Sequence, residues 1–544
     1  MTRRRLLRTL AAVLAVLAAV AGWSVLLYLS SVHAAAANSD GATVVLEGRS
    51  LVAGNLGLDH WGLSLDSFWT VDALFYALAV AVAGVVPQLL HAVPAVIATL
   101  TIALAAFIAR QGRRRWAAVA AAGAVVVLLG LPTAAFAEFF LMGPLHVATT
   151  LWCLLAILAL RRRRFGWGVA ASAALLAAGM LGDLLALAIG VLPVALAGGV
   201  AMLRSRRVGA GLPAVAAAAG GVAAWQVARR VAVALGSFSV GPANPRAPVH
   251  QMLANLGHVV TYGAALAGVG VGPFAAPSIP PVLEAAHAAG AALGVAAVLV
   301  GLAGLVRSSL TGAERAAPPG SAEGEWTFLG DAVLIGFLGS CAVFVYLSFN
   351  STPPFGRYLT PALVYAAILA GHLLGRLVER LRGRVVPAVA SAACLVVVAG
   401  YGATFARTLV AAPPAEGAAR LAAYLERHHL DRGVGAYWSS SIVTVESSGR
   451  VALRPVVALS GGRLARYPRN SEASWYGGGF QFLVFQPSAP WGGVDAASAA
   501  RSFGAPRRVV RIGSYEVLTY RHDLRIEPDG AYVTQAWRAG GPGG

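Results

Sequence analysis

Residues 31–66 read SVHAAAANSDGATVVLEGRSLVAGNLGLDHWGLSLD, and this stretch separates one apolar run from a long series of others. It holds the densest group of acidic residues before the C-terminal tail, namely Asp40, Glu47, Asp59 and Asp66, and Asp72 follows closely. Only 12% of the residues in the chain are charged, so this grouping is unusual. We therefore expect any chemistry to take place here, with Asp40 as a catalytic carboxylate at the outer face of a membrane.

Composition indicates a multi-span membrane protein. Of the 544 residues, 58% are hydrophobic and the mean hydropathy is +0.70, which leaves too much apolar surface for a water-soluble enzyme. The net charge of +19 comes from arginines that cluster in short runs between apolar segments. Such runs are typical of cytoplasmic loops rather than of a nucleic-acid surface. The three cysteines all lie in apolar stretches and indicate neither a disulfide framework nor a metal site.

The N-terminus predicts a membrane anchor. Arginines at 3–5 precede an apolar run at 6–29, which is too long for the core of a signal peptide and fits a spanning helix. This places residue 1 inside and the acidic loop 31–67 outside. Residues 68–84, within an interfacial segment 68–86, are expected to lie in the outer membrane surface. A full crossing there would put Arg113, Arg114 and Arg115 outside.

Arginine clusters mark each later return to the inside and predict a mainly α membrane domain at residues 1–410. Beyond two prolines at 413–414, helix and strand patterns alternate, so residues 411–544 predict a small extracytoplasmic α/β domain. Its expected strands lie at 434–438, 451–459, 480–485, 508–512 and 515–520, and its expected helices at 415–429 and 495–503. The eleven expected crossings lie at 6–29, 89–109, 116–131, 144–160, 167–181, 184–203, 212–235, 283–306, 328–349, 358–377 and 385–405.

This order of one crossing, an acidic external loop with an interfacial helix, many further crossings and an external C-terminal domain resembles the C-type glycosyltransferases (GT-C). The sequences that carry the resemblance are NSD at 38–40, HAVPA at 91–95 and FGRYL at 355–359. The chain most resembles the protein mannosyltransferase and aminoarabinose transferase branch and related actinobacterial membrane proteins. The resemblance implies a polyprenyl-phosphate sugar as donor and an envelope glycan, lipid or protein as acceptor.

Transfer of a sugar from a lipid phosphate needs a carboxylate to take the acceptor's proton and a cation to hold the departing phosphate. Asp40 is the expected base, although Asp-Gly is also a common turn sequence. Many family members have two adjacent acids here, whereas Asp40 is flanked by Ser39 and Gly41. Glu138, in the second external loop, is the second expected catalytic acid; it could orient the acceptor or share a divalent cation, or simply end an apolar run. No cofactor beyond such a cation is indicated.

Other residues are candidates for substrate binding. Arg357 lies outside, against the positive-inside trend, and could grip the donor phosphate with Tyr358 beside it; snorkelling at the interface is the alternative. His146, near Glu138, is either a ligand or a hydrogen-bonded structural residue. Asp183, at an outer turn, is either a functional acid near membrane depth or a helix cap. Three further candidates could line an acceptor cleft or act as caps and surface charges: Asp59, Asp66 and Asp72.

Two other functions stay open at this point. A transporter or flippase for an envelope lipid should show paired halves, and none is visible in the sequence. A membrane scaffold without catalytic activity, whose external domain binds envelope partners, would tolerate substitution at Asp40.

Overall fold

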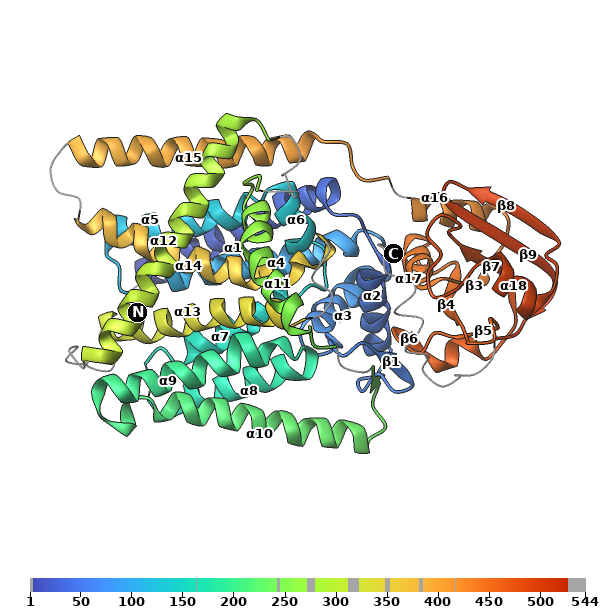
Figure 1. The fold of residues 1–544 in the computed structure, drawn as a ribbon, viewed down its shortest axis with the longest axis horizontal. Coiled ribbons are helices and arrows are strands. Elements are labelled where there is room, and N and C mark those ends of the chain that lie inside the picture. Colours follow the sequence, from blue (N-terminus) through green and yellow to red (C-terminus); the bar gives the residue numbers. More distant parts are fainter. Residues whose placement is uncertain are drawn as a thin grey trace. The chain divides into compact units, whose positions relative to one another are not determined.

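A computed structural model describes residues 3–162, 164–241, 245–271, 279–311, 322–347, 353–380, 385–415 and 417–526 (Figure 1). The chain forms two compact units. The helical unit combines Met1–Ala35, Pro94–Ala228 and Asn244–Pro413, and the mixed unit combines Ala36–Val93, Arg229–Ala243 and Pro414–Gly544. The acidic stretch therefore folds together with the C-terminal region, although most of the chain lies between them in sequence.

Six helices in the described residues are long and apolar enough to cross a membrane, or seven if one bent pair counts as a single span. The predicted count of eleven crossings is not confirmed, because two expected crossings form apolar helices of only 13 and 16 residues, Val147–Ala159 and Trp167–Gly182. The six long ones are Val13–Ala34, Leu89–Ala109, Leu187–Ser205, Pro281–Ser309, Glu325–Tyr346 and Gly356–Arg380.

Close approach between helices depends on small residues in the helical unit. A Cβ atom on Gly371 would lie 2.4 Å from the carbonyl oxygen of Ala121, so only glycine fits there. Helix α13 (Ala322–Tyr346) lies beside both α9 (Leu192–Ser205) and α14 (Thr360–Arg380) (Figure 1). The helices outside the acidic stretch and the C-terminal region are α1 (Arg3–Ala34), α4 (Leu89–Ala109), α5 (Arg115–Gly130), α6 (Ala134–Phe140), α7 (Val147–Ala159), α8 (Trp167–Gly182), the π-helical turn η1 (Leu187–Val191), α9 (Leu192–Ser205), η2 (Val208–Ala210), α10 (Leu212–Ala234), α11 (Val249–Leu266), α12 (Pro281–Thr311), α13 (Ala322–Tyr346), η3 (Pro353–Leu359), α14 (Thr360–Arg380) and α15 (Val385–Val410).

Two parts of the helical unit differ from the sequence prediction. Helices α5 and α6 are bent by 89° relative to each other, and the side chain of Thr133 caps α6 by accepting a hydrogen bond from the Phe136 amide at 3.1 Å. Glu138 consequently lies on a short helix rather than in a loop. Helix α11 occupies the region 236–281, where no such helix was predicted, because polar residues such as Gln251 and Asn255 interrupt its apolar pattern.

A six-stranded sheet in the order β5-β4-β3-β7-β9-β8 forms the centre of the C-terminal region and confirms its α/β character. Strand β3 is parallel to both β4 and β7, while β5, β9 and β8 pair antiparallel. Strand β7 (Phe480–Phe485) has the predicted limits. The predicted strand 434–438 is wrong in its second half, because helix α17 begins at Tyr437. The remaining elements are α16 (Gly417–Arg427), β3 (Arg432–Gly435), α17 (Tyr437–Glu446), β4 (Ala452–Ala458), β5 (Leu464–Arg466), β6 (Ser471–Glu472), η4 (Ala473–Tyr476), α18 (Ala496–Phe503), β8 (Arg508–Ile512) and β9 (Tyr515–Leu524).

The acidic stretch is not the loop that the sequence predicts. Helix α1 continues to Ala34, and a second helix, α2 (Ser39–Val52), begins after Asn38, whose side chain accepts a hydrogen bond from the Gly41 amide at 3.0 Å. Strand β1 (Trp61–Leu63) pairs with β2 (Ser239–Val240) on one side and β6 on the other. This three-stranded sheet joins the acidic stretch to two distant parts of the chain within the mixed unit.

Helix α3 (Asp72–Ala83) occupies the predicted interfacial segment and packs directly on α2. The two backbones approach closely at Gly48. A Cβ atom there would lie 2.8 Å from the Ala77 amide nitrogen and 2.9 Å from the Tyr76 carbonyl carbon. Helix α2, which is largely buried and packs on α3 and α17, thus holds Asp40 in its first turn on a fixed support.

Candidate functional site

Asp40 lies in the first turn of α2 and is held by a residue from the C-terminal region. The Tyr437 hydroxyl donates a hydrogen bond to Asp40 Oδ1, and the side-chain amide of Asn470 donates to the Tyr437 oxygen at 2.7 Å. These three residues are called the Asp40 cluster below. The positive end of the α2 dipole lies at the same turn and favours a charged carboxylate. Asp40 is half-buried.

Tyr437 is a neutral hydrogen-bond donor. Burial, and after it the negative charge of Asp40, raise the pKa of the Tyr437 hydroxyl well above its usual value. The phenol therefore keeps its proton at any physiological pH and can donate it in a hydrogen bond to the carboxylate. Such a bond stabilises the charged form of an acid, which is the form that accepts a proton.

Aromatic rings surround Tyr437. The ring centroids of Trp438, Tyr467 and Trp491 lie 5.0, 5.4 and 5.5 Å from its own. Tyr467 is buried, Trp491 is half-buried and Trp438 is 42% exposed. The carboxylate of Asp40 is thus hydrogen-bonded to the phenol of Tyr437, which belongs to a cluster of aromatic side chains. Trp438 is the exposed member of this cluster.

A second bond between α2 and α17 lies one turn further along both helices. The Thr43 hydroxyl lies 3.1 Å from the Ser441 hydroxyl, and both residues are buried. Because two consecutive turns are linked in this way, the position of Asp40 relative to Tyr437 does not depend on one side chain alone.

Glu47 and Asp72 form a buried acidic pair between α2 and α3. Their exposed fractions are both 2%, and that of Tyr76 beside them is 0%. Burial, and then the charge of Asp72, raise the pKa of the Glu47 carboxyl well above its usual value. Glu47 is therefore the acid in this stretch that is best placed to stay protonated, and Asp72, a predicted substrate ligand, lies in a helix interface.

The backbones of the other two acids of the stretch make local hydrogen bonds. Asp59 is exposed, and its backbone amide donates to the Asn55 side chain at 2.7 Å, which is the hydrogen bond of a turn. Asp66 is half-buried, and its carbonyl oxygen accepts from the Ser64 hydroxyl at 2.5 Å. The predicted acceptor cleft lined by Asp59, Asp66 and Asp72 stays a prediction.

A second group of candidate residues lies within the helical unit. The His146 Nδ1 atom is 2.7 Å from Asp183 Oδ2, and both side chains are almost fully buried. Asp183 also accepts from the Thr149 hydroxyl at 2.6 Å and from the Leu185 amide at 2.9 Å. With its carboxylate satisfied in this way, Asp183 fixes the orientation of the imidazole. Its role as a partner of His146 was not predicted.

His146 also joins the FGRYL motif to this group. Its ring lies 4.9 Å from that of Tyr358, and the guanidinium of Arg357 lies 5.1 Å from the Tyr358 ring centroid. His146 has a φ of 67°, a left-handed conformation that non-glycine residues adopt at a cost. We call His146, Asp183, Tyr358 and Arg357 the His146 cluster. It brings together three residues that the sequence predicts as substrate ligands.

Glu138 is exposed on α6, and within the described residues it makes no hydrogen bond or ion pair. Asp40 and Glu138, the two predicted catalytic acids, belong to different compact units. No group of three or more His, Cys, Asp and Glu side chains that could hold a metal ion occurs in the described parts of the chain.

Sequence reasoning missed Tyr437 and Asn470. The two lie 397 and 430 positions beyond Asp40, and the sequence pattern predicts a strand at Tyr437. Neither belongs to a recognisable motif, so no sequence signal linked them to Asp40. The aromatic residues around Tyr437 are likewise brought together only by folding.

Comparison with known proteins finds similarity among solved structures but not among family models or curated sequences. No family model matches the chain, and no curated protein matches it in sequence. Among solved structures, the chain is similar to an oligosaccharyltransferase of Archaeoglobus fulgidus tethered to an acceptor peptide, with 14% identity and a TM-score of 0.43. The similar region covers 80% of this chain and 63% of the archaeal chain, so the protein spans less than two thirds of that relative's length.

Proposed function

We propose that this protein is a GT-C-like membrane glycosyltransferase that moves a sugar from a polyprenyl-phosphate donor to an acceptor in the cell envelope, with Asp40 as the base. The observation that carries the proposal is the fixed carboxylate of Asp40, which is bonded by the neutral phenol of Tyr437 at the start of α2. The sequence resemblance of the NSD and FGRYL motifs supports the same class.

The proposed reaction needs one base and no covalent intermediate. An acceptor hydroxyl attacks the anomeric carbon while the bond from that carbon to the phosphate oxygen breaks. The acceptor's proton passes to Asp40, and the electron pair of the broken bond stays on the lipid phosphate. Because the phosphate is already a good leaving group, no second acid has to protonate it.

The surroundings of Asp40 suit a sugar substrate. Trp491 is half-buried and Trp438 is exposed beside Tyr437, so planar apolar faces are available near the carboxylate. Aromatic faces with a few placed polar groups are typical of small-molecule sites. In the helical unit, we propose Arg357 as a ligand of the donor phosphate, because a guanidinium can bind two phosphate oxygens at once. Its stacking on Tyr358, itself packed on His146, would orient it.

A donor panel tests the class of reaction. Purified full-length protein in liposomes would be given radiolabelled polyprenyl-phosphate sugars, hexoses and pentoses separately, together with envelope membranes as acceptor. We expect transfer of label from at least one donor to a product that is no longer extracted with the donor lipid. Label that crosses the bilayer while still linked to the lipid would instead establish a flippase, and absence of both would favour a scaffold.

A further inference from the structure

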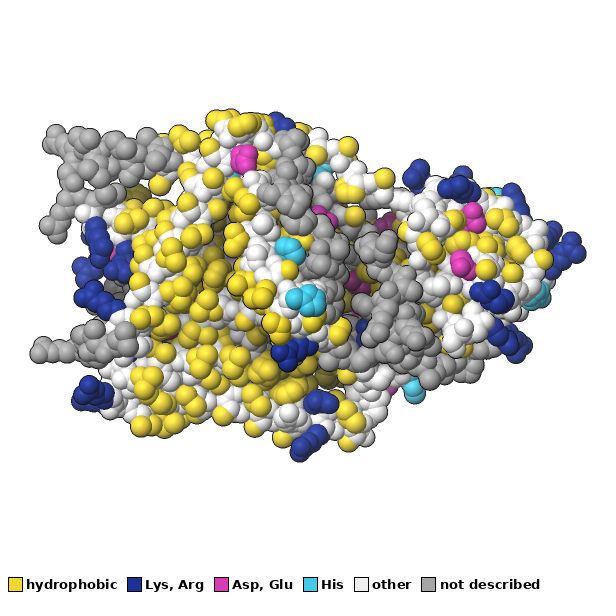
Figure 2. All heavy atoms as spheres, viewed as in Figure 1, with side chains coloured by type: hydrophobic (Ala, Val, Ile, Leu, Met, Phe, Trp, Pro, Cys, Tyr) yellow, Lys and Arg dark blue, Asp and Glu magenta, His cyan; other side chains and the backbone are white. Residues whose placement is uncertain are grey.

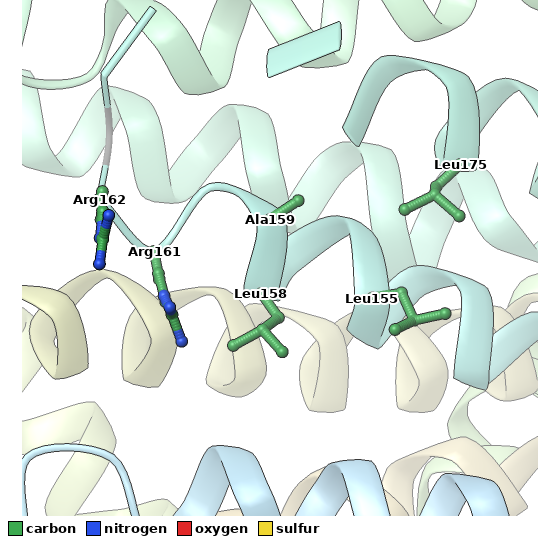
Figure 3. Close-up of a pocket in the computed structure, with 6 residues that line it drawn as sticks. All are labelled: Leu155, Leu158, Ala159, Arg161, Arg162 and Leu175. Carbon is green, nitrogen blue, oxygen red and sulfur yellow. The ribbon is translucent and has the colours of Figure 1, made fainter. Parts of the chain in front are cut away.

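A cavity opens where α7 ends and the chain turns towards α8. Its volume is ≈ 500 Å³, and Figure 3 shows the side chains that line it. Four are apolar, and the remaining two are adjacent arginines. The lining residues are Leu155, Leu158, Ala159, Leu175, Arg161 and Arg162.

The two arginines are available to a ligand. Within the described residues Arg161 takes part in no ion pair. Arg162 has a single carboxylate nearby, at 3.9 Å from Glu325, and its side chain is 69% exposed. Contact at that distance on an exposed side chain binds weakly. In Figure 3 the two guanidinium groups lie on the same side of the cavity, at one end of the row formed by the leucines.

Strongly exposed aromatic residues follow the cavity arginines in sequence. Phe165 is 63% exposed, and Trp167, the first residue of α8, is 91% exposed. Tryptophan is enriched where a membrane meets water, and arginine runs mark the cytoplasmic side. Figure 2 shows arginines gathered at one end of the helical unit, next to its broad apolar surface. The cavity therefore has a charged end formed by the two arginines and an apolar part formed by the leucines.

We propose that this cavity binds an anionic phospholipid of the cytoplasmic leaflet. The phosphate would lie against Arg161 and Arg162, and the first part of the acyl chains against Leu155, Leu158 and Leu175. Basic recesses between helices on the cytoplasmic side are known to suit such headgroups. A free phosphate would use only the arginines and leave the leucines uncovered. This site does not depend on the proposed transferase activity.

Titration with dioleoylphosphatidylglycerol tests the proposal. Detergent-purified full-length protein would be titrated with this lipid, and bound lipid counted by native mass spectrometry. The variant Arg161→Gln/Arg162→Gln is compared with the matched control Arg206→Gln/Arg207→Gln, which removes two exposed arginines outside the cavity. We expect roughly 30-fold weaker binding in the first variant and unchanged binding in the control.

Two further measurements separate the contribution of the apolar part of the cavity from that of the two arginines. Leu158→Trp would fill the apolar part while both arginines stay, so lipid binding should fall as well. Inorganic phosphate at millimolar concentration should compete poorly. Equal weakening in the control pair would overturn the proposal, because it would mean unspecific attraction of charge. Unchanged binding in the arginine variant, or full competition by inorganic phosphate, would overturn it too. Each variant's melting temperature without lipid shows that it is folded.

Discussion

Tyr437, the first residue of α17, donates a hydrogen bond to the carboxylate of Asp40 in the first turn of α2. The bond between Thr43 and Ser441 repeats this link one turn further along. A base must be held within a narrow range of positions to accept a proton at the right moment. Helices α2 and α17 together hold the Asp40 carboxylate in such a position.

Tyr437→Phe removes the hydroxyl donor and keeps the ring. We expect sugar transfer to fall by about tenfold to a hundredfold, because a hydrogen bond to a charged group contributes about 1.5–3 kcal/mol. The loss should appear in kcat rather than in KM, because phenylalanine keeps the aromatic ring that packs on Trp438, Tyr467 and Trp491. Tyr424→Phe, on helix α16 outside the cluster, is the control and should keep full activity. An unchanged rate in Tyr437→Phe would show that the bond does not matter for the reaction.

Glu47→Gln should make stability less dependent on pH. The pKa of Glu47 is raised in the folded protein, so the stabilising contribution of its protonated form is complete below the unfolded pKa and is lost as the pH rises through the folded pKa. Glutamine stays neutral at every pH. We therefore expect the variant to melt above the wild type at about pH 9, with the difference vanishing near pH 4. Asp59→Asn, an exposed acid of the same stretch, should follow the wild-type curve. A melting difference that is constant with pH would contradict the assignment.

Gly48→Ala should loosen the contact between α2 and α3. The new Cβ would lie 2.8 Å from a backbone nitrogen of α3, so one helix must shift. Overpacking of this kind costs about 1–3 kcal/mol of unfolding free energy. Gly123→Ala is the control, since no heavy atom lies within 4 Å of its Cβ position and the change should be neutral or slightly stabilising. Equal stability of the two variants would mean that the close approach at Gly48 is unimportant.

Asp183→Asn should weaken the His146 cluster. The carboxylate accepts from His146, Thr149 and the Leu185 amide, and an amide cannot accept all three bonds. We expect a loss of about 1–3 kcal/mol in stability, measured by thermal unfolding in detergent. Thr149→Val removes only one of these bonds and should cost about 1 kcal/mol. The double variant Asp183→Asn/Thr149→Val should lose less stability than the sum of the two single losses. A loss equal to that sum would mean that the residues act independently and not as one network.

Apolar periodicity predicted several elements to the residue. Leu89–Ala109 and Phe480–Phe485 are mostly apolar segments with clear limits, and the structure has both at the predicted residues. Helix α2 was missed because Asp40-Gly41 and Gly48 favour turns over helices. Its packing on α3, which needs the glycine, outweighs that preference. Tertiary contacts of this kind are invisible in a single sequence.

In the candidate site, too, some residues could be predicted from the sequence and others could not. Asp40, His146, Tyr358 and Arg357 stood out as polar residues at unusual places in an apolar chain. Their partners did not, because Tyr437, Asn470 and Thr149 are ordinary side chains in sequence and gain a role only through distant hydrogen bonds.

The central claim is that Asp40 is the base of a sugar transfer. Its most direct test is the rate at which label from a radiolabelled polyprenyl-phosphate sugar enters envelope acceptors, with Asp40→Asn compared with wild type at matched expression. Asp431→Asn, which removes an exposed acid of the C-terminal region, serves as the control for a lost charge. We predict a fall of at least about a hundredfold in Asp40→Asn and little change in the control. Equal rates in wild type and Asp40→Asn would contradict the account and remove Asp40 from the mechanism.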